Sequence, residues 1–423
     1  MGKSSQISGF YKLDISERLK IVAEFSGLSE EEVSLLKAES SLKLELADRM
    51  IENVIGIYPM PLGIATNFLI NGKDYLIPMV IEEPSVVAAA SHGAKMARVK
   101  GGFKAFTTDP IMIGQVQVVK VPDPHGARMR LLEAKEEILA KANDQDPTLV
   151  KLGGGAKDLD VKVIDTVRGP MVILELHVDC RDAMGANAIN SMAEAVAPLV
   201  EKIAGGKVLL RILSNLAVKR LARARAVIDK EAVGGEEVVD GILEAYAFAL
   251  ADPFRAATHN KGIMNGVTAV VMATGNDTRA VEAGAHAYAA RFGRYMPLST
   301  WEKNAEGDLV GTLEIPLAIG VVGGATRTHP IAKIALKILG VKTARELSEV
   351  ICSVGLAQNL AALKALATEG IQRGHMELHA RNLAIAAGAV GDLIDKVAER
   401  MVKERRVSFD RAKQILQELT QKK

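Results

Sequence analysis

Hydrophobic positions recur at intervals of three and four residues over much of the chain, and this spacing predicts helices. Between residues 15 and 50, Ser29 followed by two glutamates indicates a helix start. Residues 85–98 form an Ala-rich run of the same kind. From Asn215 to Val390 the pattern predicts long Ala-rich helices joined by Gly-rich loops. The larger part of the chain is therefore expected to be helical.

Between residues 108 and 217 apolar residues alternate with polar ones, which is typical of strands. The predicted order is a strand, a helix, two strands joined by the turn at Arg168–Pro170, a second helix and a last strand. This β-α-β-β-α-β order is the ferredoxin-like arrangement. The segments carrying it are residues 116–121, 126–142, 161–166, 171–179, 189–203 and 208–213.

These patterns predict an α+β protein in which a large, mainly helical domain carries an inserted small domain. The expected ranges are 1–107 and 218–374 for the large domain and 108–217 for the insert. The charged end, residues 375–423, is expected to be a mobile flap because it has few apolar anchors. From Asp392 onward it predicts two short amphipathic helices, the second with Ser408 as its N-cap.

Charge and composition exclude several classes of protein. The 423 residues include 53 Lys and Arg against 51 Asp and Glu, so the net charge of +2 creates no field that favours nucleic acid. Two cysteines, Cys180 and Cys352, are too few for a disulfide scaffold and fit a reducing cytoplasm.

No targeting or membrane segment is predicted. The first 16 residues are polar and contain no apolar signal core. The uncharged stretch 53–72 is interrupted by proline and glycine, so we expect a buried loop and strand there rather than a membrane helix. If the protein is an enzyme, we expect it to meet its substrates in water.

Nucleotide-binding signatures of the common kinds, G-x-G-x-x-G and G-x-x-x-x-G-K-[ST], do not occur in the sequence. The candidate for an anion site is the segment 182–187, which follows a strand and opens a helix. The alternative is a capped helix whose Gly185 allows close packing. The glycines at 153–155 and 320–324 permit close approach of a ligand, or form only tight turns.

Three charged residues are candidates for acid–base and electrostatic chemistry. Glu83, between a predicted strand (75–80) and the helix that follows Pro84, is either a proton donor or an exposed capping carboxylate. Lys261, in a predicted loop at 258–262, is either an oxyanion stabiliser or a surface lysine. Asp277 is predicted to cap the helix from Thr278 and to serve as a counter-ion for Lys261.

His375 and His379 lie four residues apart on one face of a predicted helix. This spacing suits a metal, but no third ligand accompanies it in the sequence, so no metal is predicted. A proton-transferring His375 next to a flexible tail is the functional interpretation, and a packed surface histidine is the alternative.

Taken together and in order, six segments resemble 3-hydroxy-3-methylglutaryl-CoA (HMG-CoA) reductase, in its class II, prokaryotic form without a membrane anchor. The resemblance spans more than 300 residues. Its segments are Glu52–Gly56, Glu83–Ser85, Asp182–Gly185, His259–Gly262, Ala273–Asp277 and Gly374–Met376.

The resemblance implies a four-electron reduction of HMG-CoA to mevalonate and CoA with two nicotinamide cofactors, through a hemithioacetal and mevaldehyde. By this resemblance, Lys261 stabilises the oxyanion and His375 protonates the departing thiolate. Glu83 donates a proton to the aldehyde, and Asp277 bridges Lys261 and Glu83.

The family also implies binding residues for both ligands. Ser85, Arg255 and Asn265 match positions that hold the glutaryl end. Asp146 matches an acidic position in NADH-using relatives, so NADH is expected, with NADPH as the alternative. The remaining cofactor-binding positions are Asp182, Met184, Gly185, Ala186, Asn187, Asn215, Gly323 and Gly324.

Relatives carry an Arg directly after the N-terminal Phe, whereas Phe10 is followed here by Tyr11 and Lys12, so the CoA-end contacts stay open. The family implies a homodimer with interfacial active sites, in mevalonate and isoprenoid metabolism. The physiological direction, synthesis or breakdown of mevalonate, stays open.

Two alternatives belong to other classes. The ferredoxin-like insert of an RNA-binding protein would need paired aromatics on its sheet, and the strand at 171–177 contains none. A thiolase-like acyltransferase would need a nucleophilic cysteine, and neither Cys180 nor Cys352 lies in a segment typical of a reactive thiol.

Overall fold

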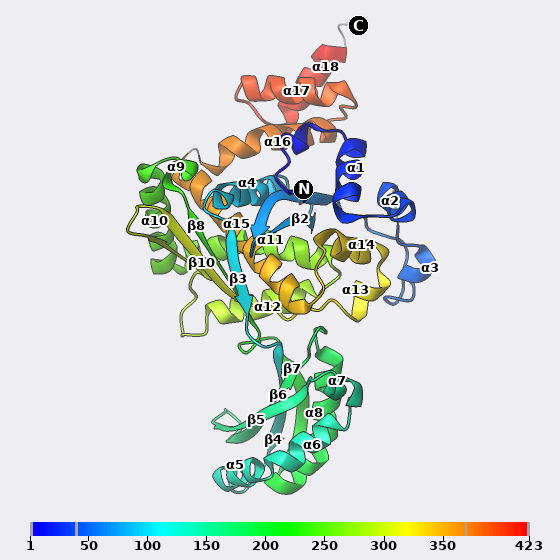
Figure 1. Ribbon diagram of the computed structural model, residues 1–423, viewed down its shortest axis with the longest axis vertical. Coiled ribbons are helices and arrows are strands. Elements are labelled where there is room, and N and C mark those ends of the chain that lie inside the picture. Colours follow the sequence, from blue (N-terminus) through cyan, green and yellow to red (C-terminus); the bar gives the residue numbers. More distant parts are fainter. Residues whose placement is uncertain (1–2, 39–40, 369, 421–423) are drawn as a thin grey trace.

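The computed structural model describes residues 3–38, 41–368 and 370–420; the side chains of residues 371–378 lie outside this description. The chain forms a large α+β body in the middle, a small domain at one end and a group of C-terminal helices at the other (Figure 1). The N-terminal elements are η1 (Phe10–Lys12), α1 (Ile15–Ser26), α2 (Glu30–Lys37) and α3 (Leu44–Ala47).

A six-stranded sheet forms the centre of the large body, in the order β2-β1-β3-β8-β10-β9. Its strands are β1 (Leu62–Ile70), β2 (Lys73–Val80), β3 (Phe103–Thr107), β8 (Leu221–Ile228), β9 (Ser299–Lys303) and β10 (Leu309–Pro316). The helices of this body are α4 (Val86–Arg98), α9 (Lys230–Val233), α10 (Glu236–Ala251), α11 (Pro253–Ala273), α12 (Thr278–Ala289), α13 (Gly324–Thr328), α14 (Pro330–Leu339) and α15 (Ala344–Ala367).

The expectation of helices alone after Asn215 was wrong, because three of these strands follow it. β8 shows the reason: Ala222, Ala224 and Ala226 are buried while Arg223 and Arg225 alternate with them. The period of two is that of a strand, but alanine is a strong helix former and a weak strand former. Pairing with β3 and β10 overrides this local preference.

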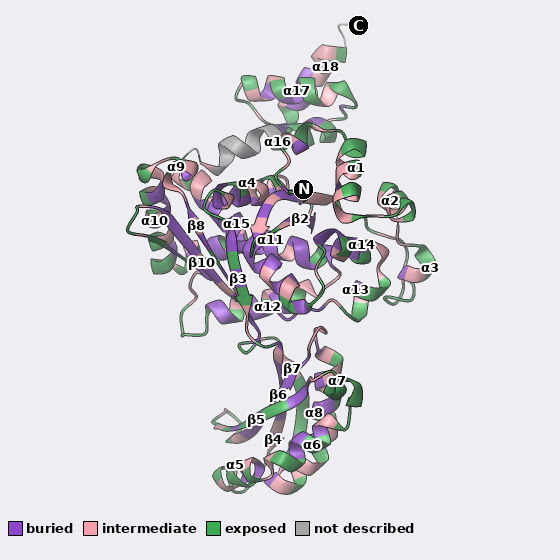
Figure 2. Cartoon of the chain, viewed as in Figure 1, coloured by how far each residue is buried: buried purple, intermediate pink, exposed green. Residues whose placement is uncertain are grey.

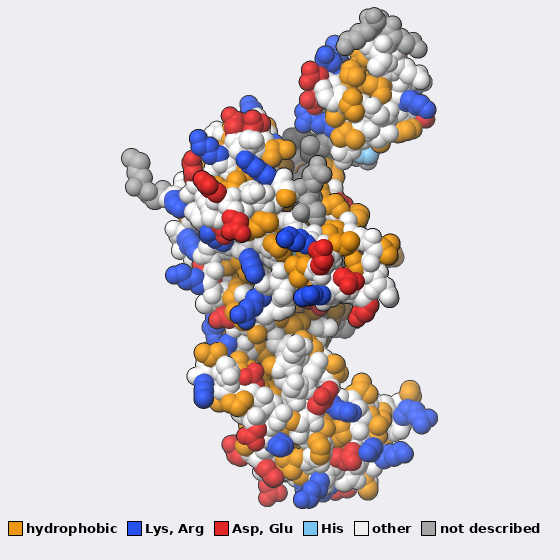
Figure 3. All heavy atoms as spheres, turned by 90° about the vertical axis from the view of Figure 1, so that its right-hand side faces the viewer, with side chains coloured by type: hydrophobic (Ala, Val, Ile, Leu, Met, Phe, Trp, Pro, Cys, Tyr) orange, Lys and Arg blue, Asp and Glu red, His pale blue; other side chains and the backbone are white. Residues whose placement is uncertain are grey.

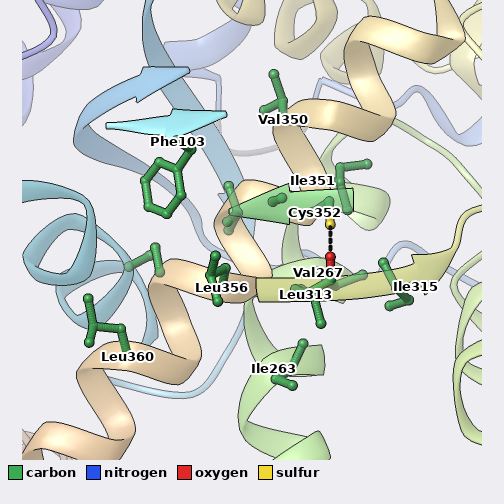
Figure 4. Packing of buried hydrophobic residues seen from close by; sticks show 14 of the residues in the cluster. Phe103, Ile263, Val267, Leu313, Ile315, Val350, Ile351, Cys352, Leu356 and Leu360 are labelled. Atoms are coloured by element: carbon green, nitrogen blue, oxygen red, sulfur yellow. Dashed lines mark hydrogen bonds between the residues drawn. The ribbon is translucent and has the colours of Figure 1, made fainter. Parts of the chain in front are cut away.

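α15 passes through the core of the large body. It is long and apolar enough to cross a membrane, but 72% of its most apolar window is buried inside the protein. Figure 2 shows the burial of α15 and of the sheet beside it. In the close-up of Figure 4, Ile351, Cys352 and Leu356 of α15 pack against Leu313 and Val267. α15 is therefore a core helix, on which α4 and α11 also pack.

The small domain has the predicted ferredoxin-like order. Its sheet, β5-β6-β4-β7, is antiparallel throughout, and its helices cover one face (Figure 1). One expected helix, 126–142, is instead two helices that meet at Ala134, whose backbone leaves the helical region (φ −85°, ψ 14°). The elements are β4 (Ile111–Val119), α5 (Pro124–Glu133), α6 (Lys135–Asn143), α7 (Pro147–Lys151), β5 (Gly155–Ile164), β6 (Met171–Asp179), α8 (Ala186–Ala204) and β7 (Lys207–Ser214).

The C-terminal helices α16 (Ile371–Ala386), α17 (Asp392–Lys403) and α18 (Phe409–Thr420) enclose an apolar cluster of their own. Val397, Met401 and Ile415 are buried in it. The tail therefore has more apolar anchors than the charge pattern predicted. The predicted cap is confirmed, since the Ser408 hydroxyl accepts from the Arg411 amide at 3.3 Å. In the view of Figure 3 these helices project from the body, and charges of both signs are interspersed over the visible face.

The segment before β1 departs from the expectation of a buried loop. Ile55 and Tyr58 are exposed, the latter at 86%, while β1 itself carries buried residues such as Phe68. The first helices behave as predicted: the side chain of Ser29 accepts from the amide of Glu32, and the Glu32 carboxylate accepts from the amide of Ser29. These helices pack on α14 through a small apolar cluster that includes Val22 and Ile338.

Candidate active site

Glu83 and Lys261, which are 178 positions apart in the chain, meet at one point of the large body. Lys261 Nζ donates to Glu83 Oε2 at 2.7 Å. The side chain of Lys261 is 59% exposed and that of Glu83 is 36% exposed. The pair is thus an ammonium and a carboxylate in direct contact, open to solvent and to a ligand.

Glu83 reaches this place through the turn between β2 and α4. Ser85 is the N-cap of α4 and has a left-handed backbone (φ 75°). Pro84 therefore lies before the cap, and the helix predicted from residue 85 begins at Val86. The turn directs Glu83 away from the buried start of α4, where Val86 is 3% exposed.

Lys261 lies inside α11, so the predicted loop at 258–262 was wrong. Gly262 lowers helix propensity, but Asp252 caps the helix, Pro253 begins it, and the apolar face packs on α15. The two residues before Lys261 are buried and fix its position. Asn260 donates to the Met296 carbonyl at 2.9 Å.

His259, the other buried neighbour, contacts Ser299 Oγ through Nε2 at 2.7 Å. Burial lowers the pKa of His259 to about 3, so the imidazole is neutral at physiological pH. His259 therefore adds no positive charge beside the Lys261 ammonium.

Asp277 caps α12 as predicted. Its Oδ1 accepts from the amides of Arg279 and Ala280 at 3.0 and 3.2 Å, and it forms an ion pair with Arg279. The described residues show no hydrogen bond or ion pair from Asp277 to Lys261 or Glu83. The predicted bridge is therefore not formed among the described residues, where Asp277 Oδ1 bonds to the start of α12.

The residues expected to hold the glutaryl end lie near the pair in sequence. Asn265 follows Lys261 by four residues on the same face of α11, and Ser85 follows Glu83 by two. Arg255 lies in the first turn of α11, and burial lowers the pKa of its guanidinium. Tyr11 and Lys12, at which the sequence left the contacts with the CoA end of the substrate open, are both exposed in η1.

His375 lies in α16, and its side chain is outside the described residues. His379, one turn later, is exposed. Over the residues that the structure describes, no group of three His, Cys, Asp or Glu side chains is arranged to hold a metal ion.

The segment 182–187 contacts the loop that contains Gly323 and Gly324. The Val321 amide donates to the Asp182 carbonyl at 2.9 Å, and Ala183 forms a β-bridge with Val322. The Gly320 amide donates to Asn276 Oδ1 at 2.8 Å, which connects the same loop to the residue beside Asp277. The 320–324 segment therefore links the predicted cofactor segment, 182–187, with Asn276, the residue next to the predicted catalytic residue Asp277.

Glycines in this region leave room for a ligand or for close packing. Gly323 and Gly324 have positive φ, and a Cβ on either would meet no atom within 4 Å. Gly185 is different, because a Cβ there would lie 2.3 Å from Cys180 Sγ. The close-packing interpretation therefore holds for Gly185, while the 323–324 loop is open.

Two carboxylates of the predicted cofactor site bond to the backbone. Asp182 Oδ1 accepts from the Ala344 amide at the start of α15, and Asp146 caps α7 through the Leu149 amide, both at 2.8 Å. Met184, Ala186, Asn187 and Asn215 are at least partly accessible. The predicted cofactor residues thus lie between β6 and the first turn of α8, in the adjoining 320–324 segment, directly before α7 and directly after β7.

Arg220 was missed by sequence reasoning. It is only 5% exposed, and its guanidinium donates to the carbonyls of Ala183 and Met184, both at 3.0 Å, and of Ile319. Burial lowers its pKa. Arg220 therefore fastens the 182–185 turn to the 319–324 loop. The sequence offers no local signal for this role, because the three acceptor carbonyls lie 36 to 99 positions away in the chain.

Both thiols are buried. Burial raises the pKa of Cys180 to about 11 and raises that of Cys352 further. Neither is a thiolate at neutral pH, which excludes the acyltransferase alternative that needs a cysteine nucleophile.

Comparison with known proteins agrees with this geometry. Residues 14–380 match the family model described as hydroxymethylglutaryl-coenzyme A reductase. The chain is 64% identical to 3-hydroxy-3-methylglutaryl-coenzyme A reductase of Archaeoglobus fulgidus over 98% of its length and 95% of that protein. It is 35% identical to a probable enzyme of the same name from Borreliella burgdorferi, over 88% of this chain and 86% of that one.

Solved structures of the Streptococcus pneumoniae enzyme have the same fold. One superposes with a TM-score of 0.84 at 41% identity, over 97% of this chain and 99% of that one. A second, described as class II and bound to NADPH in open conformations, has a TM-score of 0.82 at 41% identity, over 96% of this chain and all of that one. The chain therefore belongs to the hydroxymethylglutaryl-coenzyme A reductase family, in its class II form.

Proposed function

We propose that Glu83, Lys261, Asp277 and His375 carry out the HMG-CoA reductase reaction of this family at the site where Glu83 and Lys261 meet. The observation that carries this proposal is their 2.7 Å contact, which joins a hydrogen-bond donor cation to a proton-transferring carboxylate. Reduction of HMG-CoA to mevalonate and CoA consumes two hydrides and two protons, so both kinds of group are needed.

Lys261 acts on the substrate carbonyl. Reduction of the thioester builds negative charge on its oxygen, and a positioned cation is a strong stabiliser of that charge. An ammonium has three N–H donors, of which one is bonded to Glu83, so donors remain for the oxyanion. A bound reduced nicotinamide supplies the hydride for each reduction.

Two further groups handle the protons. The hemithioacetal breaks its C–S bond, and His375 gives a proton to the departing CoA thiolate, a task suited to an imidazole near neutral pH. Glu83 then gives a proton to the oxygen of mevaldehyde as the second hydride reaches its carbon. The short contact with Lys261 provides a path for returning a proton to Glu83. Asp277, at the start of α12, takes the role that the family implies and bridges Lys261 and Glu83 once substrate is bound.

The binding residues follow the same proposal. Arg255, with Ser85 and Asn265, holds the glutaryl carboxylate, to which a guanidinium is complementary. The 182–187 segment with Asn215, Gly323 and Gly324 holds the dinucleotide, and the open positive-φ glycines fit close approach of a ligand. Asp146 accepts from the adenosine ribose and repels a 2′-phosphate, which favours NADH.

The large body, the insert at 108–217 and the flap from 375 onward act as separate units, a division supported by their separate apolar clusters. Closure of the flap brings His375 to the thioester and excludes water. We assign the enzyme to the cytoplasm because its two cysteines, Cys180 and Cys352, are free thiols rather than a disulfide, and to a homodimer on the family resemblance.

One experiment tests the assignment of His375. His375→Gln should slow reduction of HMG-CoA far more than reduction of added mevaldehyde, because only the first reaction expels a thiolate. Equal losses in both assays would remove His375 from that role. Rates with HMG-CoA and with mevalonate plus CoA, each with both nicotinamide cofactors, establish the cofactor preference and the favoured direction.

A further inference from the structure

Arg181 lies between the end of β6 and the 182–187 segment, and its backbone is in the left-handed region (φ 51°). That region is unfavourable for a residue with a Cβ atom, so the surrounding structure must hold Arg181 there. The Arg181 amide donates to Asp179 Oδ1 at 2.9 Å, which supports this conformation. The chain therefore turns sharply at a long cationic side chain, directly before the predicted cofactor segment.

The Arg181 side chain reaches the glycine run at 153–155. Its Nη2 donates to the Gly153 carbonyl. Gly153 has a φ of 83°, and a Cβ there would lie 2.6 Å from Nη2, so a glycine is needed for this contact. Nε lies 3.6 Å from Asp179 Oδ1 and, in the described part of the chain, is buried without a hydrogen-bond partner. The side chain as a whole is 41% exposed.

This position places the guanidinium between two parts of the proposed cofactor site. Asp146 caps the start of α7, and Gly153 follows its end. The five residues of α7, about 7.5 Å of helix, therefore separate Asp146 from the glycine run that Arg181 contacts. The segment that opens α8 begins one residue after Arg181.

The charged side chains near the turn include three carboxylates and Arg220, besides Arg181 itself. Asp146, Asp179 and Asp182 are all acidic, and each already accepts a backbone N–H at 2.8 to 2.9 Å. Arg220 is committed to three carbonyls and is 5% exposed. Arg181 is partly exposed, and of the five N–H donors that a guanidinium offers it gives one to Gly153.

We propose that Arg181 binds the pyrophosphate of the nicotinamide dinucleotide, an inference that rests on the proposed function. The guanidinium presents paired donors to the phosphate oxygens, and Gly153 and Asp179 hold it in place. Because both nicotinamide cofactors carry the pyrophosphate, Arg181 contributes to the binding of both, while Asp146 discriminates between them.

Direct binding tests this assignment without turnover. Isothermal titration calorimetry is done with NADH, NADPH and ADP-ribose on the wild type, Arg181→Gln, Arg181→Lys and Arg128→Gln. Arg128 is the matched control, because its Nε donates to the Val161 carbonyl at 2.8 Å elsewhere in the same domain. Arg181→Gln should weaken all three ligands at least about tenfold, since a hydrogen bond to a charged group is lost. Arg181→Lys should lose less, and Arg128→Gln should stay within about twofold.

Several results would overturn the proposal. Unchanged binding in a folded Arg181→Gln protein would show that the residue serves only the turn. A loss confined to NADPH would place the guanidinium at the 2′-phosphate instead. Should Arg181→Gln unfold, Gly153→Ala, which displaces the guanidinium, must still weaken NADH and ADP-ribose together. A wild type that binds neither dinucleotide would refute the proposed function itself, a failure distinct from these.

Discussion

Replacing Lys261 by alanine separates catalytic from structural importance at the Glu83–Lys261 pair. The two charged atoms are 2.7 Å apart, and both side chains are open to solvent, at 59% and 36% exposure. The perturbation removes the cation and leaves the carboxylate accessible to water. We expect a large loss of turnover with little loss of stability.

The small expected loss of stability follows from the exposure of both side chains. With the dielectric constant of water, two unit charges 2.7 Å apart attract by about 1.5 kcal/mol, and ordering the side chains offsets part of it. Exposed pairs accordingly contribute about 0–1 kcal/mol. Loss of an oxyanion-stabilising donor costs about 100- to 1000-fold in kcat, because the charge develops only in the transition state.

The assay pairs steady-state HMG-CoA reduction with urea unfolding. Lys337→Ala is the matched control, since Lys337 of α14 contacts Glu32 of α2 at 2.5 Å, with exposures of 40% and 25%. Both variants should lose less than about 1 kcal/mol of stability, but only Lys261→Ala should lose turnover. Retention of more than a tenth of wild-type kcat, or a loss of several kcal/mol in stability, would refute the reasoning.

Three further predictions concern stability. Arg220→Met should lower the free energy of unfolding by about 3–5 kcal/mol, because three buried carbonyls lose their donor; a loss under 1 kcal/mol in urea titrations would contradict this. Gly185→Ala should destabilise more than Gly205→Ala, since both have positive φ but only the first meets an atom, a sulfur 2.3 Å from the added Cβ; equal thermal shifts would be the contrary result. Burial alone would raise the pKa of Asp74, but hydrogen bonds from Arg98 and a serine outweigh it and hold that pKa below 3.8. The carboxylate therefore stabilises the fold above pH 3.8, and this contribution disappears as pH falls through the folded pKa, so the unfolding free energies of wild type and Asp74→Asn should converge in acid and differ at neutral pH.

Features that depend only on residues close together in the chain could be predicted from the sequence. The cap of α2 at Ser29, the cap of α12 at Asp277 and the order of the small domain all come from side chains or periodicities within a few residues. The resemblance to the family also came from short segments. Glu83 and Lys261 were named from those segments, but not their contact.

The missed features depend on partners far away in the chain. β8 reads as helix because of its alanines and becomes a strand through β3 and β10. Lys261 was expected in a loop between two helices, but it lies inside α11, which packs on α15. Arg220 acts on carbonyls 36 and 99 positions away.

The amino-acid sequence by itself determined the α+β class, the ferredoxin-like insert, the family and the residue types of the site, because periodicity, caps and short segments are local properties. Only the tertiary structure decided which groups touch: Lys261 with Glu83, Asp277 with its own helix, and Arg181 with Gly153. The physical reason is that a hydrogen bond or an ion pair depends on distances of about 3 Å between side chains. Packing of the whole chain sets those distances.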